Sequence, residues 1–327
     1  MANYLITGVA GFIGSSLAHA LVERGDQVRG IDNFLTGKRT NLDGLWDRID
    51  FREADLRDTA AVGEACEGID YILHQAALPS VPLSVQEPKP SHSCNIEATF
   101  NLLEGARSAR VRRIIYAASS SAYGDQPVLP STETMRPMPI SPYAVQKLTG
   151  EYYMSSYWQV FGLETVSLRY FNIFGPRQSA DSPYSGVLAK FILQMLTGQR
   201  PTIFGTGLQG RDFTFVENVV SANLLASQAP PEKVTGRVFN IACGGSHTLR
   251  DVYSTLARII GFDGDPLYGP PRNGDILNSQ ADITAAAEAF GYKPLVAFED
   301  GLERTVQWYR QVLNLQAVAP SATASHK

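Results

Sequence analysis

Cysteine is scarce in this sequence, and its few cysteines do not form a recognisable framework. Cys66, Cys94 and Cys243 are an odd number among 327 residues, and none belongs to a CxxC pair. This argues against a disulfide-stapled secreted protein and against a four-cysteine zinc site. We therefore expect a protein of the reducing cytoplasm without a metal site, and we treat Cys94 and Cys243 as small hydrophobic side chains.

An excess of basic charge and a long apolar run are also missing. The chain has 28 Lys and Arg against 32 Asp and Glu, a net charge of −4, which excludes a generally basic protein that coats nucleic acid. A membrane-spanning helix needs about 18 or more apolar residues in a row, and no such run occurs. The first apolar run begins at Tyr4, which leaves no room for an export signal.

The first half of the chain alternates between short apolar strands and helices. The predicted strands are 4–7, 27–31, 69–74, 113–118 and 164–170. The predicted helices are 13–24, 59–66, 94–109 and 143–161. This alternation predicts an α/β fold, a doubly wound parallel sheet covered by helices on both faces.

After Asn172 the pattern loosens, which predicts a smaller second lobe. Helices are expected at 187–197, 249–260 and 302–312, and one more strand at 237–241. We expect a first domain over 1–171, to which 212–245 partly returns, and a second lobe over 172–211 and 246–316. The small, polar residues 317–327 predict a disordered tail.

A glycine-rich turn separates the first predicted strand from the first predicted helix. Gly8, Gly11 and Gly14 have a GxxGxxG spacing, one residue off the usual dinucleotide fingerprint. Glycines there allow a tight turn and a close approach of a pyrophosphate, while the start of the helix supplies N–H donors. The alternative is a strand-to-helix turn that binds nothing.

An acidic residue ends the second predicted strand. Asp32 follows Gly14 by 18 residues, where a carboxylate can accept hydrogen bonds from the ribose hydroxyls of a dinucleotide. Its neighbour Asn33, in place of an arginine, favours NAD over NADP. Lys38 and Arg39 lie further on and keep a 2′-phosphate site open. The alternative for Asp32 is an aspartate of an ordinary turn.

A serine at a strand end and a Tyr-x-x-x-Lys pair form a second constellation. Ser119 follows an apolar strand, and Ser141 and Pro142 predict the start of a helix that carries Tyr143 and Lys147 on one face. Tyrosine has an ordinary pKa of about 10, and a nearby ammonium group favours its phenolate. The alternative is an exposed tyrosine and lysine on an amphipathic helix.

Together these motifs resemble the extended short-chain dehydrogenase/reductases, and within them the NAD-dependent nucleotide-sugar 4-epimerases of the bacterial UDP-N-acetylglucosamine and UDP-glucose types. The resemblance covers the chain from Gly8 to about Tyr309. It implies a Rossmann domain that binds NAD and a small C-terminal lobe that binds a nucleoside-diphosphate sugar. Further motifs that carry it are Asp55-Leu56, His74-Gln75-Ala76-Ala77, Asn95, the run 119–124 and Arg169-Tyr170-Phe171-Asn172.

The resemblance implies roles for individual residues. Tyr143 would take the proton of the sugar 4-OH while a hydride passes from C4 to the nicotinamide, and Ser119 matches the catalytic Ser/Thr position. Lys147 would hold the nicotinamide ribose and lower the pKa of Tyr143. The implied NAD-binding residues are Gly8, Gly11, Phe12, Ile13, Gly14, Asp32, Asn33, Gly37, Asp55, Leu56, His74, Gln75, Ala76, Ala77, Asn95, Tyr143, Lys147 and Tyr170.

A site for the UDP-sugar is implied in the same way. Arg211 and Arg272 match arginines that grip the diphosphate, which suits a guanidinium because it is always charged and donates in a planar fork. The alternative for each is a solvated surface charge. The implied substrate residues are Pro79, Ser80, Ser120, Ser121, Asn172, Gly186, Val187, Arg211, Arg272, Asp275 and Ser279.

The residues between Ser119 and Tyr123 bear on the type of reaction. Dehydratases and decarboxylases of the resembled family usually carry a glutamate or an Asp-Glu pair there, whereas this chain has Ser120 and Ser121. Without a carboxylate, elimination of water lacks its acid, which favours reversible C4 epimerisation through a 4-keto sugar. A UDP-glucuronate decarboxylase and a non-catalytic NAD-binding scaffold are the weaker alternatives.

The substrate is predicted from the pocket wall. A bulky tyrosine gatekeeper blocks N-acetyl sugars in the resembled family, and its position here is Ser279, with Gly186 at another wall position. A roomy pocket predicts UDP-GlcNAc and UDP-GalNAc, and also UDP-Glc and UDP-Gal, although Pro79 departs from the usual Gly or Lys. A UDP-glucuronate 4-epimerase is the alternative; it would need a cation for the C6 carboxylate, and none is identified. Ser279 as an ordinary loop serine also stays open.

Relatives of this type dimerise through two helices of each chain. Here these helices would be 94–109 and 143–161. We therefore expect a homodimer, without a nucleic-acid or membrane partner.

Overall fold

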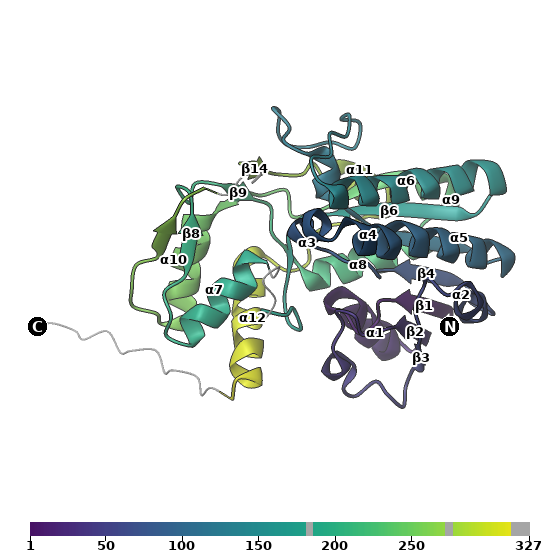
Figure 1. Ribbon diagram of the computed structural model, residues 1–327, viewed down its shortest axis with the longest axis horizontal. Helices are drawn as coiled ribbons and strands as arrows, with labels where there is room; N and C mark the ends of the chain where they lie inside the picture. The colour runs from purple at the N-terminus through teal and green to yellow at the C-terminus, as the bar shows by residue number, and fades with distance from the viewer. Residues whose placement is uncertain (181–185, 272–276, 315–327) are drawn as a thin grey trace, which may run out of the picture.

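A sheet of seven strands forms the centre of the molecule (Figure 1), in the order β11-β6-β5-β4-β1-β2-β3. The computed structural model describes residues 1–180, 186–271 and 277–314. All six strand pairs of this sheet are parallel. The strands are β1 (Asn3–Thr7), β2 (Gln27–Asp32), β3 (Asp50–Glu53), β4 (Tyr71–His74), β5 (Arg113–Ser119), β6 (Glu164–Tyr170) and β11 (Arg237–Ile241).

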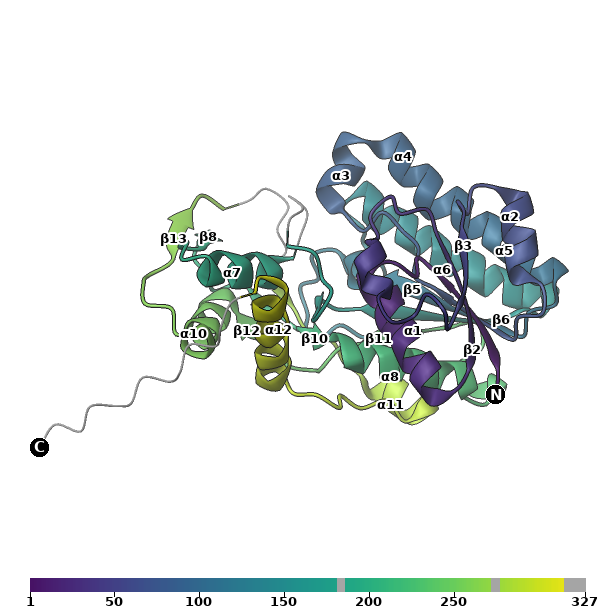
Figure 2. The same cartoon turned by 90° about the horizontal axis from the view of Figure 1, so that it is seen from below.

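Helices cover both faces of the sheet because the strands are apolar on both faces (Figure 2). Successive residues of β1 belong to different cores, since Leu5 packs with the helices of one face and Ile6 with those of the other. The predicted doubly wound parallel sheet is thus confirmed. The helices of the Leu5 face are α2 (Thr59–Cys66), α5 (Ala98–Ser108) and α6 (Pro142–Phe161), and those of the Ile6 face are α1 (Phe12–Arg24), α8 (Val216–Gln228) and α11 (Thr284–Phe290).

The remaining elements form a smaller lobe beside the sheet, on the left in Figure 1. Its core is a third apolar cluster that includes Phe174, Phe213, Phe215 and Phe298. Its helices are α7 (Val187–Leu196), α10 (Leu249–Ile260) and α12 (Phe298–Val312). Its short strands pair as β7 (Ile173–Phe174) with β10 (Thr214–Phe215), β8 (Thr202–Phe204) with β13 (Leu267–Gly269), and β9 (Gly210–Arg211) with both β12 (His247–Thr248) and β14 (Asn278–Ser279).

Several short elements were not predicted from the sequence. Proline usually indicates a break in a helix or strand. Here Pro82, Pro88 and Pro231 each stand in the first turn of a short helix, where the missing N–H costs nothing. The strand β3 is polar and half-exposed, so it lacks the apolar pattern of its neighbours. The short helices are α3 (Val81–Gln86), α4 (Pro88–His92), α9 (Pro231–Val234), η1 (Arg39–Leu42) and η3 (Ser120–Tyr123).

The predicted helix 94–109 is divided in two. Its first turns are a π-helical segment, η2 (Ser93–Glu97), and α5 follows without a break. Such widened turns carry one residue more than an α-helical turn and often lie near functional sites. The predicted tail 317–327 lies outside the described residues. Across the described part of the chain, no helix is long and apolar enough to cross a membrane.

The order of the strands determines where a ligand can bind. β1 has β2 on one side and β4 on the other, so the winding of the chain reverses between β1 and β4. In open sheets of this kind, the loops leave in opposite directions at such a point, and a crevice opens beyond the carboxyl ends of the strands.

Candidate active site

A cavity of about 750 Å³ lies beyond the carboxyl ends of β1, β4 and β5. It is therefore located where the strand order reverses. Residues from the sheet and from the start of the small lobe share its wall. The predicted site residues that line it are Gly8, Gly11, Phe12, Ile13, Gly14, Asp32, Asn33, Asp55, Leu56, Gln75, Ala76, Ala77, Pro79, Ser80, Ser119, Tyr143, Lys147, Tyr170, Asn172 and Gly186.

The glycine turn is too tightly packed for any side chain. Gly8 has a φ of +68°, and a Cβ on it would lie 2.8 Å from Cα of Ala76. A Cβ on Gly14 would lie 2.1 Å from the carbonyl oxygen of Gly8. The turn leads into α1, whose first N–H groups have no acceptor within the helix. Bare N–H groups next to a cavity are the arrangement that binds a pyrophosphate.

Asp32 connects the glycine turn to the cavity wall. Its carboxylate accepts hydrogen bonds from the backbone N–H of Ala10 at 2.9 Å and of Phe34 at 2.8 Å. Burial raises the pKa of Asp32, and these N–H groups oppose that effect. Beside it, Nδ2 of Asn33 donates to Asp55 at 2.7 Å. The acceptor oxygens of Asp32 and Asp55 are thus grouped where the hydroxyls of an adenosine ribose can donate to them.

Arg177 is a cavity residue that the sequence analysis missed. It follows β7 at the start of the small lobe and reaches back to α1, where its Nη2 donates to Oγ of Ser16 at 3.2 Å. Its Nε is buried without a hydrogen-bond partner in the described part of the chain, and burial lowers the pKa of the guanidinium. A guanidinium with an unsatisfied N–H beside the glycine turn fits a negatively charged group such as a pyrophosphate. No local pattern could have indicated it.

Ser119, Tyr143 and Lys147 meet on the same wall. Ser119 is the last residue of β5, and the other two belong to the first turns of α6. As predicted, Ser141 caps this helix, since its Oγ accepts from the N–H of Ala144 at 3.2 Å, and proline follows the cap. Burial raises the pKa of Tyr143, whereas its hydrogen bond with Ser119 lowers it.

Lys147 is bonded to the backbone of β5. Its Nζ donates to the carbonyl oxygen of Ala117 at 2.8 Å, and burial lowers its pKa to about 8. The polar interaction with Ser119 opposes the effect of burial on the pKa of Tyr143. That Lys147 lowers the pKa of Tyr143 stays a prediction.

His74 lies behind the cavity wall, which corrects the expectation that it contacts NAD. One ring nitrogen is bonded to Oγ1 of Thr7 at 2.7 Å and the other to Oγ1 of Thr99 at 2.9 Å. Burial lowers its pKa to about 3, so the ring is neutral. His74 therefore joins β1, β4 and α5 below the site. His74 is next to Gln75, which does line the cavity, and the sequence alone does not show which of the two side chains faces the ligand.

Asn95 and Gly37 also support the wall rather than form it. Oδ1 of Asn95 accepts from the N–H of Leu78 at 2.7 Å, and its Nδ2 donates to Gln146 at 2.7 Å. A Cβ on Gly37 would lie 2.9 Å from the carbonyl carbon of Ala10, so this glycine allows two backbone segments to approach. Asn95 is buried with its side chain bonded inside the core, which corrects its expected contact with NAD, whereas the expected contact of Gly37 stays a prediction.

Asn172 connects the cavity to the small lobe. It has a φ of +40°, and its Nδ2 donates to the carbonyl oxygen of Asp212 at 2.9 Å and to Oγ of Ser279 at 3.2 Å. Ser279 thus stands directly behind a residue of the wall. In the short sheet, Arg211 on β9 is paired with His247 on one side and with Ser279 on the other.

Some predicted substrate residues do not reach the wall. Oγ of Ser121 donates to Oγ of Ser119 at 2.9 Å and so stands one layer further out. Arg272 and Asp275 lie outside the described residues. Those that are described but do not line the cavity are Ser120, Ser121, Val187, Arg211 and Ser279.

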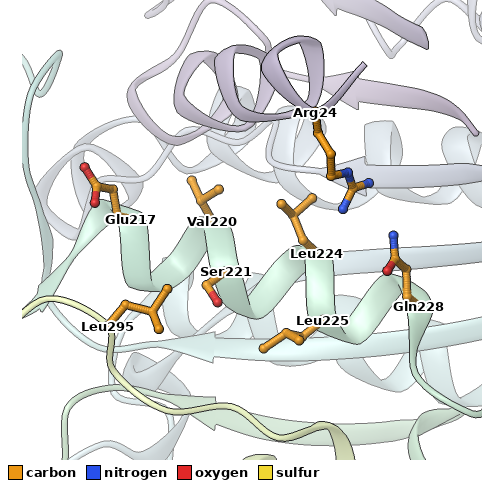
Figure 3. A pocket seen from close by; sticks show the side chains of 8 residues that line it. All are labelled: Arg24, Glu217, Val220, Ser221, Leu224, Leu225, Gln228 and Leu295. Carbon is orange, nitrogen blue, oxygen red and sulfur yellow. The ribbon is translucent and has the colours of Figure 1, made fainter. Parts of the chain in front are cut away.

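A second hollow lies away from this site, over α8 (Figure 3). It contains none of the predicted site residues. Half of its lining residues are apolar, and the whole set consists of Arg24, Glu217, Val220, Ser221, Leu224, Leu225, Gln228 and Leu295.

Comparison with known proteins agrees with the geometry of the cavity. Residues 4–242 match the NAD dependent epimerase/dehydratase family. The chain belongs to this family. NAD is therefore its cofactor, and the glycine turn, Asp32 and Arg177 fit its pyrophosphate and adenosine ribose.

Individual relatives in this family cover almost the whole chain. A UDP-glucose 4-epimerase of Mycolicibacterium smegmatis is 36% identical over 94% of this chain and 98% of its own. The solved structure of the UDP-N-acetylglucosamine 4-epimerase of Methanobrevibacter ruminantium, with UDP-N-acetylmuramic acid, has a TM-score of 0.91 and 37% identity over 95% of this chain and 99% of that one. The UDP-glucuronic acid 4-epimerase of Bacillus cereus, with UDP-glucuronic acid and NAD, has a TM-score of 0.88 and 33% identity over the same shares.

Proposed function

We propose that this protein is a UDP-hexose 4-epimerase that interconverts UDP-GlcNAc and UDP-GalNAc, and also UDP-Glc and UDP-Gal. The observation that carries the proposal is the meeting of Ser119, Tyr143 and Lys147 on the wall that also holds the glycine turn. Related 4-epimerases with UDP-glucose and UDP-N-acetylglucosamine in their names support the reaction type.

The chemistry assigned to the chain is a proton transfer at the sugar 4-OH. When bound, NAD supplies the acceptor that takes the C4 hydrogen as hydride and returns it to the other face. In its phenolate form, Tyr143 takes the hydroxyl proton on its Oη as C4 becomes a ketone, and the resulting phenol gives the proton back when the alcohol re-forms. Ser119 hydrogen-bonds Tyr143 and stands where it can orient the same oxygen.

The charged groups of the cavity support a neutral sugar. In the described part of its wall, the cations are Lys38, Lys147 and Arg177. The N–H of Lys38 donates to the carbonyl oxygen of Ala10 in the glycine turn, and Arg177 also reaches that turn. Lys147 is bound to β5. The side chains of Arg177 and Lys147 are therefore engaged away from a C6 carboxylate, which disfavours UDP-glucuronate.

The small residues near Asn172 support the N-acetyl sugars. Ser279 backs Asn172 through its hydroxyl, and Gly186 lines the cavity at the start of α7. Neither fills the space where a tyrosine gatekeeper would stand in related enzymes. Pro79 also lines the cavity, where it replaces the usual Gly or Lys.

We also propose that the protein acts as a homodimer joined through α5 and α6. These helices lie side by side (Figure 1). Both carry large apolar side chains that are exposed. Those side chains are Phe100, Val145, Tyr152, Val160 and Phe161.

The test is incubation of the purified protein with UDP-GlcNAc, UDP-Glc and UDP-GlcA in separate reactions, with the products resolved by NMR. We expect mixtures of C4 epimers from UDP-GlcNAc and UDP-Glc, and no conversion of UDP-GlcA. The variant Tyr143→Phe removes the proton carrier and keeps the ring, so turnover should fall about 10²- to 10⁴-fold while NAD stays bound. Full activity in this variant would contradict the mechanism, and conversion of UDP-GlcA alone would move the protein to the uronate epimerases.

A further inference from the structure

A buried acid stands one helical turn behind the catalytic lysine. Tyr143, Lys147 and Glu151 are spaced by four residues on α6, so they form a column along one face of the helix. Glu151 is only 4% exposed, as is Lys147. The proposed function uses the first two members of this column and leaves the third without a role.

Glu151 is held in place by a two-pronged ion pair. Nε of Arg169 lies 2.9 Å from Oε1 of Glu151, and Nη2 lies 2.7 Å from Oε2. Both side chains are 3% exposed. Two parallel hydrogen bonds of this kind fix the plane of the carboxylate as well as its position. The carboxylate therefore has one defined orientation toward Lys147.

Arg169 is also held by contacts on the side away from Glu151. On β6 it stands opposite Asn240 of β11, and its guanidinium carbon lies 4.5 Å above the ring centre of Tyr123. The hydroxyl of Tyr123 donates to Oδ1 of Asn240 at 2.7 Å, and the N–H of Asn240 donates to Glu133 at 2.7 Å. This chain of contacts leaves Arg169 little freedom, so the ion pair is rigid.

The charge of Glu151 is the one that acts on Lys147. Burial lowers the pKa of Lys147, and the attraction of Glu151 raises it again. His74 on β4 is neutral because burial lowers its pKa, and Tyr116 on β5, whose ring centre is 5.0 Å from Nζ of Lys147, is neutral because burial raises its pKa well above the usual value.

The other charged groups around α6 have partners elsewhere. Glu97 on η2 accepts a hydrogen bond from Oγ of Ser93, Cys94 is neutral because burial raises its pKa, and Glu104 on α5 pairs with Arg107. On β6, Glu164 pairs with Arg113 at the opposite end of the sheet. The remaining titratable groups on the elements packed against α6 are Lys89, His92, Tyr123 and Tyr170.

Stability alone does not account for the buried ion pair of Glu151 and Arg169. Replacing a buried ion pair by apolar side chains of similar size is often neutral or stabilising. The same pair next to a buried ammonium has a second effect, because it offsets the loss of hydration that disfavours the charge on Lys147.

We propose that Glu151, fixed by Arg169, is a positioning residue that acts through Lys147: its carboxylate keeps the buried lysine in the ammonium form and in place on the cavity wall. The inference rests on the proposed function for the importance of Lys147 in the reaction. The electrostatic part is independent of turnover and can be measured on the NAD-loaded protein by itself.

The experiment compares the NAD-loaded wild type with Glu151→Gln. The titration of Lys147 is followed by NMR on protein with ¹³C at the lysine ε-carbons, and its signal is identified by its absence from Lys147→Arg. Removal of the carboxylate should lower the pKa of Lys147 by about one unit or more. The alkaline limb of the kcat profile for UDP-Glc and UDP-GlcNAc should move to lower pH by the same amount, with KM nearly unchanged.

Glu164→Gln is the matched control, since Glu164 also pairs with a buried arginine across β5 and β6, with Oε2 at 2.7 Å from Nε of Arg113. In Glu164→Gln, the pKa of Lys147 and the alkaline limb of the kcat profile should both stay as in the wild type. Glu151→Asp, which keeps the charge, should restore most of the wild-type profile.

Two outcomes separate the two proposals. An unchanged Lys147 titration in folded Glu151→Gln overturns the inference even if kcat falls. If the Lys147 titration is shifted in Glu151→Gln but the wild type turns over neither sugar, the inference is supported and the proposed function is contradicted. Should Glu151→Gln not fold, Glu151→Leu/Arg169→Met removes the carboxylate without leaving the guanidinium of Arg169 unpaired, and the same downward shift is expected of it.

Discussion

Gly14 and Gly63 are both helical glycines, but they differ in what surrounds them. A Cβ on Gly14 would lie 2.1 Å from the carbonyl oxygen of Gly8, whereas nothing lies within 4 Å of a Cβ on Gly63. Backbone atoms cannot move aside as a flexible side chain can. The close approach at Gly14 is therefore what allows the glycine turn and α1 to face a pyrophosphate together.

We expect Gly14→Ala to lower the free energy of unfolding by about 2 kcal/mol or more, because the methyl group forces the turn open. The affinity for NAD, measured by calorimetry, should fall with it. Gly63→Ala is the control and should stabilise the protein by about 0.5 to 1 kcal/mol, since alanine is the better helix former in open space. Normal NAD affinity in Gly14→Ala would show that the turn is not the pyrophosphate site.

A second prediction concerns Ser279, which stands behind Asn172. Under the proposed gatekeeper role of Ser279, the ring of Ser279→Tyr takes the space of the acetamido group of an N-acetyl sugar. The kcat/KM for UDP-GlcNAc should fall about 100-fold, while that for UDP-Glc should change little. Ser279→Ala keeps the space and should accept both sugars. Equal losses for both sugars in Ser279→Tyr would mean that this residue does not select the substrate.

At the scale of elements, Asp212 joins three segments that are far apart in the sequence. Its carboxylate accepts hydrogen bonds from the N–H groups of Cys243 at 2.9 Å, Gly244 at 3.0 Å and Ala281 at 3.3 Å. It thus holds the end of β11 and the segment after β14 next to β9. Burial outweighs these bonds and raises the pKa of Asp212 to about 6.

This pKa predicts an unusual dependence of stability on pH. A carboxyl group with a raised pKa in the folded state binds its proton more tightly there, so its contribution falls as the pH rises from about 4 to 6. The advantage of the wild type over Asp212→Asn in free energy of unfolding should shrink by about 3 kcal/mol between pH 4 and pH 7.

Asp282 provides the opposite control for this measurement. The N–H and hydroxyl of Thr284 lower the pKa of Asp282, so the advantage of the wild type over Asp282→Asn should grow as the pH rises through the acid range. Urea unfolding at several pH values measures both variants. The same sign for the two would contradict the assignment of Asp212.

At the scale of the whole molecule, we expect the purified protein to have twice the chain mass of 35.7 kDa in light scattering. Val145 and Tyr152 on α6 are 47% and 62% exposed and lie two helical turns apart on one face. Val145→Glu/Tyr152→Glu should give the monomer, because charged groups cannot be buried in an apolar interface. Leu225→Glu, in the hollow over α8 (Figure 3), should leave the dimer intact. The reverse result would move the interface to α8.

Most of the local structure could be predicted from the sequence. The strands of the central sheet other than β3, the cap at Ser141 and the glycine turn follow from patterns a few residues long. A buried strand, a helix start and a tight turn each place their demands on neighbouring residues, so the signal is local. The Tyr143 and Lys147 pair was visible for the same reason.

Only the tertiary structure decided whether a side chain faces the cavity or the core behind its wall, and which residues it contacts there. His74 and Asn95 are next to true wall residues in the sequence but turn their polar atoms to other parts of the core. Arg177 reaches α1 from the other lobe, and Glu151 meets Arg169 from a different strand. These contacts depend on the order and register of the strands, which long connections determine and no short stretch of residues encodes.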